Sequence, residues 1–427
     1  MRPKPRVAES LADFQQFLKV TIERSNFQLS QINISNQQEW RLSDGAFSHL
    51  SGGFFHVTGL ENRETGEEHL VLFQPQSSIT GLALYRTNDS IYVLLQARIE
   101  PGNSGIGQYG PTIQSTPANY LRVHGGKQTP YLDLFTTYSS QAQPIANSMQ
   151  LDLGKRYFHK SKSHIYVEVP MLIETQENMI WVPLSVIAKA LAHDNFINAD
   201  LRSLVSVLDW DMFFTNKKFH ILPDDQSRFY SALLSDNRLD VGSWKFTPVT
   251  GLKNWKLLDE GIVDISNSGI SVGFYQISCT NREVNTWVQP LMKSHSQGLV
   301  ALLMRNHGDE VEFLVSLDLE YGISGKQIVL PSYVIYPGED LANKPAWITG
   351  SILSEFVQSD EGGRFYQHES VYQLIQTPGN FTLENQQHWI SIHTLKCLLK
   401  TSNMVSFQLR CIASLVIEKL NPLTFSK

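Results

Sequence analysis

Polar and acid–base side chains are densest in residues 96–126, which read QARIEPGNSGIGQYGPTIQSTPANYLRVHGG. An apolar run ends there at Glu100, and a glycine-rich loop follows in which the backbone can adopt positive φ and approach a ligand closely. The stretch offers carboxylate, imidazole, amide and hydroxyl groups, which suit general acid–base chemistry. It therefore predicts a ligand pocket, although its composition alone also fits a solvated hairpin loop.

A second group of charged side chains is purely basic. Residues 153–164 read LGKRYFHKSKSH and contain no acid. If they form one strand, Arg156, Lys160 and Lys162 share a face. Such a face could hold a diphosphate through charge-assisted hydrogen bonds. The alternative is a solvated edge strand that its lysines protect from aggregation.

A third candidate segment combines small residues with aromatic rings. It runs from His49 to His56 and reads HLSGGFFH. Phe54 and Phe55 beside two glycines suit a pocket in which a base or sugar ring stacks. An ordinary core strand is the alternative interpretation of this segment.

Composition and missing motifs exclude several function classes. The 427 residues are 42% hydrophobic and carry a net charge of −6, which argues against disorder and against bulk binding to nucleic acid or membranes. The sequence lacks P-loop, dinucleotide-binding, HExxH and GxSxG motifs and the clustered glutamates of a Nudix metal site. It has no apolar run long enough for a membrane span, and its three cysteines have no CxxC spacing. We therefore expect a cytoplasmic protein with reduced thiols and no metal.

The chain repeats a set of landmarks in the same order. Trp40 recurs 215 positions later as Trp255, and Arg202 recurs 208 positions later as Arg410. Several such matches in register favour gene duplication over unrelated strands that share Gly and Pro punctuation. The sequence predicts a helical extension, a first domain, a connector and a second domain, at residues 1–26, 27–215, 216–244 and 245–420.

Each half begins with strand-like runs and closes with helical stripes. The β-branched and aromatic runs are residues 70–73, 91–99, 164–173 and 311–319. Apolar residues at helical spacing mark residues 11–22, 184–191 and 201–208, and Asp200 is the expected N-cap of the last of these helices. Strands followed by helices in each unit predict α+β domains.

Together with the duplication, several segments resemble the NDP-hexose 2,3-dehydratase family. They are HLSGGFF (49–55), QARIEPGN (96–103), PTIQST (111–116), NYLRVHGG (119–126), DNFINADLRSLVS (194–206), REVNTWVQPL (282–291) and SDEGGRFYQ (359–367). The resemblance implies two tandem Nudix-like α/β/α domains related by duplication, usually paired as a homodimer. It also implies a catalytic nucleotide-sugar pocket in the first half and a degenerate one in the second. The chain departs from the family's SEQG motif at residues 151–154 and from its KRNRN motif at residues 160–164.

The resemblance also implies a reaction. The substrate is a (d)TDP-linked 4-keto-6-deoxyhexose, whose C4 ketone acidifies the C3 hydrogen. A base removes that hydrogen, an acid assists departure of the C2 hydroxyl, and a 3,4-diketo-2,6-dideoxy sugar results. No redox cofactor or metal is needed, and an NADPH-dependent 3-ketoreductase is the expected functional partner.

Residue roles follow by placing this reaction on the polar segments. Candidates for base, acid and enolate stabilisation are Glu100, His124, His49, Asp152, Arg98 and Lys160. Candidates for holding the nucleotide sugar are Phe54, Phe55, Gln74, Gln96, Asn103, Thr112, Gln114, Thr116, Asn119, Arg156 and Lys162. The second pocket is assigned Trp287, Gln289, Glu320, Tyr333, Arg364 and Tyr366. No metal ligand is assigned.

Two other functions remain open at the level of sequence. The changed SEQG segment would fit a non-catalytic or altered-specificity binder of nucleotide sugars. A duplicated structural scaffold is the third interpretation, and it predicts no rise in melting temperature when TDP is added.

Overall fold

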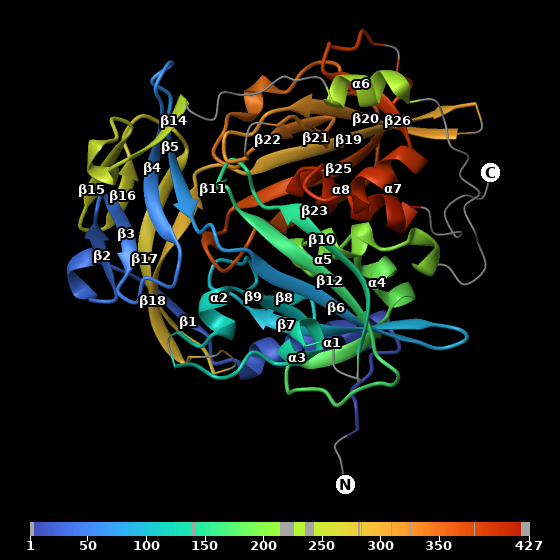
Figure 1. Cartoon of the computed structure of the whole chain (residues 1–427), viewed down its shortest axis with the longest axis horizontal. Helices are drawn as coiled ribbons and strands as arrows, with labels where there is room; N and C mark the ends of the chain where they lie inside the picture. The colour runs from blue at the N-terminus through green and yellow to red at the C-terminus, as the bar shows by residue number, and fades with distance from the viewer. Residues whose placement is uncertain are drawn as a thin grey trace.

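A computed structural model describes residues 4–123, 125–137, 142–213, 226–234, 243–280, 282, 284–308, 310–323, 326–379 and 381–419. Four sheets and the helices between them form the protein (Figure 1). Across these described ranges, no helix has the length and apolarity that crossing a membrane requires. The predicted connector at 216–244 lies partly outside them, and it includes helix α6 (Ser227–Leu234).

The large sheet of the first half has the strand order β10-β12-β6-β7-β13, with β8 paired to β7 and β9 paired to β6. Its strands are β6 (Ser78–Arg86), β7 (Ile91–Ile99), β8 (Gly107–Gly110), β9 (Ile113–Ser115), β10 (Gln143–Leu151), β12 (Ser161–Glu168) and β13 (Met179–Pro183). Strand β12 runs parallel to β6, and the other pairs are antiparallel. Apolar side chains make β7 almost entirely buried.

The second half repeats this sheet strand for strand. Its order is β23-β25-β19-β20-β26, with β21 paired to β20 and β22 paired to β19. The strands are β19 (Gly298–His307), β20 (Glu310–Asp318), β21 (Ile328–Pro331), β22 (Tyr333–Ile335), β23 (Ser351–Ser359), β25 (Glu369–Gln376) and β26 (Gln387–Ser391). The one parallel pair, β19 with β25, is again at the same place.

Two smaller sheets exchange their first strands. One has the order β11-β5-β4-β3-β2 and the other β24-β18-β17-β16-β15. Strand β1, from the start of the first half, pairs with β17 of the second, and β14, from the start of the second, pairs with β4 of the first. The bounds are β1 (Gln28–Ile32), β2 (Trp40–Ser43), β3 (Ala46–His49), β4 (His56–Asn62), β5 (Glu68–Phe73), β11 (Tyr157–Phe158), β14 (Trp244–Thr247), β15 (Trp255–Leu258), β16 (Gly261–Asp264), β17 (Ile270–Ser278), β18 (Thr286–Ser294) and β24 (Phe365–Tyr366).

The helices that close each half fill the space between the two large sheets, while the small sheets lie together at one side (Figure 1). The α-helices are α1 (Leu11–Arg24), α2 (Pro117–Tyr120), α3 (Leu132–Thr136), α4 (Leu184–Ala190), α5 (Ala199–Val207), α7 (Ile392–Lys400) and α8 (Phe407–Lys419), and the short 3-10 helices are η1 (Ile34–Asn36), η2 (Trp210–Phe213), η4 (Val249–Gly251) and η5 (Leu341–Asn343). Helices α5 and α8 are equivalent in the two halves and pack against each other. Arg410 donates to Ser203 at 2.7 Å, and Arg202 donates to Ser414 at 3.3 Å.

Reciprocal backbone contacts lock each half to a turn of the other. The Gly102 N–H donates to the Gly362 carbonyl at 2.8 Å, and the Gly102 carbonyl accepts from Gln367 at 2.7 Å. In the same way, Gly322 contacts the backbone of Gly154 and His159. A β-carbon on Gly102 would overlap the backbone of Phe365, so this close approach requires glycine.

Several predicted elements are confirmed and three details are wrong. Residues 91–99 form β7 and the segment from Leu11 forms α1, whose N-cap Ser10 makes a capping box with Asp13. The predicted strand 164–173 ends at Glu168, within β12. Asn198, and not Asp200, caps α5 by accepting from Leu201 N at 2.9 Å.

The basic segment 153–164 is also not one strand. Strand β11 ends at Phe158, His159 has φ of 53°, and β12 starts at Ser161. This break turns Arg156 away from Lys160 and Lys162, toward the second half, where it donates to Pro337 O at 2.6 Å. The predicted single basic face is therefore wrong, because the left-handed residue interrupts the alternation of the strand.

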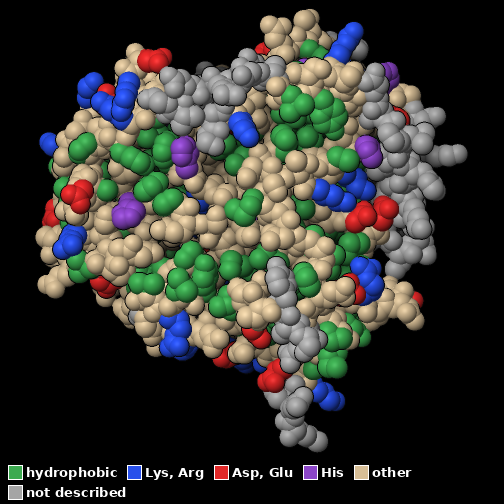
Figure 2. Space-filling model, in the orientation of Figure 1, with side chains coloured by type: hydrophobic (Ala, Val, Ile, Leu, Met, Phe, Trp, Pro, Cys, Tyr) green, Lys and Arg blue, Asp and Glu red, His purple; other side chains and the backbone are tan. Residues whose placement is uncertain are grey.

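The viewed face of the molecule carries its charges mainly near the outline, and its centre is mostly uncharged (Figure 2). Inside the protein, by contrast, several ionisable side chains are buried together, among them Lys162, Asp152, Asp200 and Glu361. Buried charges are costly unless they are paired. Their position in the fold therefore marks the site that needs explanation.

Candidate active site

One cavity, of about 340 Å³, brings together polar residues from both halves. The predicted first-half residues that line it are His49, Phe54, Phe55, Arg98, Glu100, Gln114, Thr116, Asn119 and Lys162. Strands β7, β9 and β12 of the large sheet present Arg98, Gln114 and Lys162, and the β3–β4 turn presents the aromatic group. The glycine-rich segment and the aromatic segment thus reach the same space.

Three residues assigned to the second pocket line this same cavity. They are Trp287 and Gln289 on β18 and Arg364 in the turn before β24. The reciprocal turn contacts carry Arg364 into the first half, where it donates to Gln74 at 2.8 Å. The site is therefore shared between the halves.

The remaining predicted residues lie beside or away from the cavity. Gln96, Gln74, Lys160 and Asp152 contact residues of its wall, while Thr112 is buried in hydrogen bonds to the backbone of Ala83 and Leu94. Asn103 packs against Gly362, and Arg156 faces His368. Glu320 accepts from Tyr336, Tyr333 lines a separate hollow, and Tyr366 stacks on Tyr275. His124 lies outside the described residues.

Three acids that sequence reasoning missed also line the cavity, namely Glu39, Asp200 and Glu361. Asp200 was interpreted as a helix cap, since aspartate is a common N-cap. Glu361 stands in the segment SDEGGRFYQ of the second half. The charge excess of residues 153–164 was a usable signal, because buried lysines require nearby acids.

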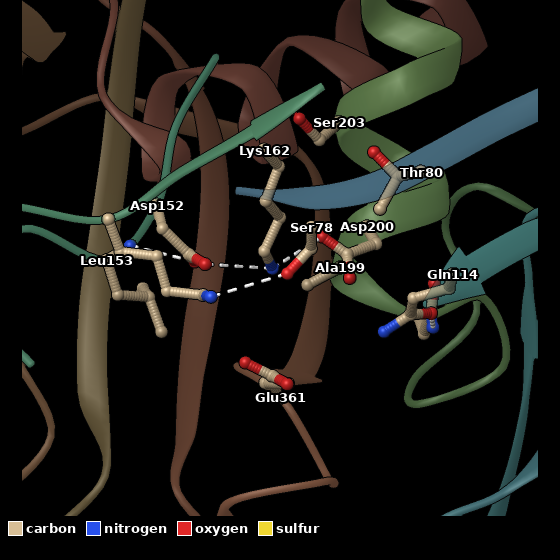
Figure 3. A network of polar contacts seen from close by, with 12 residues as sticks. Ser78, Thr80, Gln114, Asp152, Leu153, Lys162, Ala199, Asp200, Ser203 and Glu361 are labelled. Atoms are coloured by element: carbon tan, nitrogen blue, oxygen red, sulfur yellow. Dashed lines mark hydrogen bonds and ion pairs between the residues drawn. The ribbon is translucent and has the colours of Figure 1, made fainter. Parts of the chain in front are cut away.

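Lys162 is the centre of a buried ion cluster (Figure 3). Its Nζ lies 3.2 Å from Asp152 Oδ2 and 2.8 Å from Asp200 Oδ1. Burial would lower the Lys162 pKa, but the charges of Asp152 and Asp200 outweigh it and hold that pKa above its usual value. Burial raises the pKa of Asp200. The cluster thus combines a fixed cation with a carboxyl group that retains a proton more readily than usual.

Glu361 and Arg364 form a second charged pair. Arg364 Nη1 donates to Glu361 Oε1, and the Tyr157 hydroxyl donates to Glu361 Oε2 at 2.7 Å. Burial would raise the Glu361 pKa, but Arg364 and Lys162 outweigh it and lower that pKa to about 2. Since both oxygens are engaged, Glu361 is an ionised anchor for Arg364 more than a proton acceptor.

Glu100 is held differently from Glu361. Arg98 Nε and Nη2 lie 3.1 and 3.0 Å from the same oxygen, Oε1, and Nη1 donates to Gln96 at 2.8 Å. Arg98 thus orients the carboxylate through one oxygen and leaves Oε2 out of the pair. A carboxylate oriented in this way beside a cavity suits a general base.

Lys160 lies behind the cavity wall. Its Nζ donates to Gln74 Oε1 at 3.2 Å and to Ser78 Oγ at 3.3 Å. Gln74 Oε1 also accepts from Arg364, so two cationic side chains share one amide oxygen. Burial, together with the charge of Arg364, lowers the pKa of Lys160 to about 7.

Aromatic rings form the more exposed side of the cavity. The His49 ring stands edge-on to Phe54, with centroids 4.7 Å apart, and to Trp40, at 5.4 Å. The Trp40 indole donates to Val288 O at 2.7 Å across the two halves. Trp287 and Phe55 complete this group, and rings arranged around a half-open space suit a planar ligand group.

The equivalent positions of the second half carry different chemistry. The strand pairings match Arg98, Gln114 and Lys162 with Asp318, Val334 and Ser370. In the equivalent helices, Gln408 takes the place of Asp200. This half therefore lacks the charged cluster at those four positions. Within the described part of the chain, no three His, Cys, Asp or Glu side chains are grouped so that they could bind a metal ion.

Comparison with known proteins gives concordant results. A family model described as NDP-hexose 2,3-dehydratase matches residues 11–208 and 227–416, a stretch in each half. A protein of Saccharopolyspora spinosa named dTDP-4-dehydro-6-deoxy-alpha-D-glucopyranose 2,3-dehydratase is 23% identical over 442 residues, covering 94% of this chain and 90% of the relative. Proteins of the same name from Streptomyces violaceoruber and Amycolatopsis orientalis are each 25% identical, covering 88% and 91% of this chain and 89% and 86% of those relatives.

Proposed function

Because the chain belongs to the NDP-hexose 2,3-dehydratase family, we propose that it removes the C2 hydroxyl of a dTDP-linked 4-keto-6-deoxyhexose. The names of three relatives support this substrate. The main structural support is one cavity that combines a buried cluster of acids and cations with an aromatic rim. Such a site can bind a planar base at one end and polarise a sugar at the other.

One end of the cavity is more deeply buried than the other, and this difference sets the orientation that we propose for the ligand. Lys162, Asp200 and Glu100 are each at most 4% exposed, whereas His49 and Phe54 are only partly buried. The reacting sugar takes the buried end, where electrostatic interactions are strongest. The nucleotide takes the aromatic end, and Arg282 and Arg364 at the wall are the candidates for the diphosphate.

The elimination can be written with these side chains. Glu100 takes the C3 proton, and the electron pair moves toward the C4 oxygen to form an enolate, which the Lys162 cation stabilises. The C2–O bond then breaks, and Asp200 supplies a proton so that the hydroxyl leaves as water. The resulting enol tautomerises to the 3,4-diketo sugar. Each proton transfer contributes roughly 10²–10⁴ in rate.

The other predicted groups take supporting roles. Arg98 orients Glu100, and Asp152 orients Lys162. Lys160 fixes Gln74, which in turn contacts Arg364. Gln114, Thr116 and Asn119 are candidates for sugar hydroxyls because they line the cavity.

The test follows the substrate itself. The protein is incubated with dTDP-4-keto-6-deoxyglucose in deuterium oxide, and the C2 and C3 signals are followed by NMR. Loss of the C2 hydroxyl with entry of deuterium at C2 is the expected result. Saturating binding with an unchanged sugar would support the binder interpretation, which the altered residues 151–154 and 160–164 favour.

Further parts of the proposal rest on the resemblance. Each half is inferred to be Nudix-like from the resemblance, and the repeated order of strands supports the duplication that this inference assumes. A homodimer, a cytoplasmic location and coupling to an NADPH-dependent 3-ketoreductase remain proposals of the same kind. So does a second ligand pocket in the second half, for which Glu320, Tyr333 and Tyr366 are the remaining candidates.

A further inference from the structure

The turn of residues 361–364, between β23 and β24, enters the cavity from the second half and is held rigidly. The Gly362 carbonyl accepts from Gly102 N at 2.8 Å, and the Gly363 carbonyl accepts from Gln289 Nε2 at 2.6 Å. Phe365 N donates to Glu361 O at 3.1 Å, which closes the turn. The backbone at Gly363 therefore has a fixed position in the cavity wall.

Neither the backbone nor the packing of the protein requires a glycine at position 363. Its φ lies outside the left-handed region. A β-carbon there would lie 3.4 Å from Glu361 Oε1 and 3.9 Å from Glu100 Oε1, which are ordinary contact distances. The neighbouring Gly362 differs, because a β-carbon on it would overlap the Asn103 side chain.

The repeated turn of the first half shows that a side chain fits this position. Lys155 is the counterpart of Gly363, one residue before the paired arginines Arg156 and Arg364. Its side chain extends to Glu339 at 3.3 Å and passes 4.2 Å from the Tyr336 ring centre. The same turn thus accommodates a long residue where it does not face the cavity.

We propose that Gly363 is a specificity-determining residue whose bare Cα lets the hexose ring lie against the turn, between the carboxylates of Glu100 and Glu361. This inference rests on the proposed function. The direction of a β-carbon at Gly363 assigns the contact to the sugar, because it points to the two buried acids and not to the aromatic rim. A methyl group at this point would occupy the place of the ring.

The test compares Gly363→Ala with Gly251→Ala. Gly251 also lies outside the left-handed region, and a β-carbon on it would be 3.6 Å from its nearest neighbour, Thr247, away from the cavity. Both variants should melt at or slightly above the wild-type temperature, since alanine restricts the unfolded chain. Gly363→Ala should lose about 100-fold in kcat/KM, because a small displacement of the reacting groups has that effect. Gly251→Ala should keep wild-type kinetics.

Binding measurements separate this inference from the proposed function. Calorimetry with dTDP and with the unreactive dTDP-glucose gives the contribution of the sugar to affinity. Gly363→Ala should bind dTDP as the wild type does and lose the added affinity for dTDP-glucose. If it does so while the wild type fails to dehydrate the keto sugar, the inference stands and the proposed reaction falls.

Three results would overturn the inference. Unchanged dTDP-glucose affinity and turnover in Gly363→Ala would show that the ring does not lie there. An equal loss of dTDP affinity would place the contact at the nucleotide end. A melting temperature several degrees below that of Gly251→Ala would show that the fold itself requires the glycine.

Discussion

The two halves have the same strand order but very different interiors. In the first half, Lys162 lies between Asp152 and Asp200, and Arg98 holds Glu100. In the second half, Ser370 replaces Lys162 and Asp318 replaces Arg98, while Glu320 accepts from Tyr336 in a closed environment. The same strand order therefore carries charge pairs beside a cavity in the first half, and the second half lacks these pairs at the equivalent positions Ser370 and Asp318.

The second half nevertheless contributes directly to the first. Its turn provides Glu361 and Arg364 to the cavity, whereas the equivalent Arg156 is engaged by Pro337 O and His368 Nε2, at 2.6 and 3.2 Å. The comparison suggests that duplication separated the roles of the two copies. One copy provides the floor of the site, and the other provides part of its wall.

The largest expected effect comes from removing the central cation. Lys162→Met leaves the buried acids Asp152 and Asp200 without their cationic partner, which should lower the free energy of unfolding by roughly 3–5 kcal/mol. Turnover should fall by roughly 10²–10⁴ through loss of enolate stabilisation. Chemical denaturation and product formation measure the two effects. Ser370→Ala is the matched change in the second half, and we expect it to keep wild-type turnover. Equal losses of turnover in both variants would refute the difference between the two halves.

Exchanging one carboxyl for an amide in each half tests which glutamate is the base. Glu100→Gln should lower kcat by roughly 10²–10⁴ and leave the melting temperature within a few degrees. Glu320→Gln should keep kcat and melt no lower than the wild type, because burial already raises the pKa of Glu320 and favours its neutral form. Steady-state kinetics and thermal melting of the two variants show which glutamate acts as the base. Near-wild-type kcat in Glu100→Gln would remove it from the mechanism.

The paired arginines should separate binding from stability. Arg364→Lys loses the planar contact to Glu361 and Gln74 and should raise KM roughly 10- to 100-fold, since a hydrogen bond to a charged group contributes about 1.5–3 kcal/mol. Arg156→Lys should lower the melting temperature and leave KM unchanged. Measurement of KM and of the melting temperature for both variants tests this prediction. An unchanged KM in Arg364→Lys would place the diphosphate elsewhere.

The last expected effect is a pH dependence of the free energy of unfolding, caused by Lys160. Its folded-state pKa of about 7 lies below the ordinary value of 10.5, so the unfolded chain binds more protons between these values. The contribution of Lys160 to the free energy of unfolding therefore rises with pH across that window and is lowest below pH 7. Relative to Lys160→Met, the wild type should gain up to about 1.4 kcal/mol per pH unit above pH 7. Denaturation curves whose difference does not vary from pH 6 to 9 would contradict this.

Local patterns predicted many elements but not their mutual placement. Alternation and apolar spacing located β7 and α1, because those signals depend on neighbouring residues. The exchange of β1 and β14 joins strands far apart in the chain, as in the pairing of Gln28 with Ser278. No local periodicity encodes such a pairing, so the sequence assigned each strand to its own half.

The same reason explains what was missed in the site. The segment 96–126 revealed Glu100 and Arg98 because their neighbours are unusually polar. Asp200 matched a helix-cap pattern, and its real partner, Lys162, lies 38 positions away. Arg364 was assigned to the second half by its position in the chain, although reciprocal turn contacts place it in the cavity of the first.

The most direct test of the shared cavity is a crystal structure of the protein with dTDP-glucose bound. We expect the hexose beside Gly363 and Glu100, the diphosphate near Arg364, and the base among His49, Phe54 and Trp287. Ligand density confined to the second half, with the first-half cavity empty at saturating ligand, would contradict it.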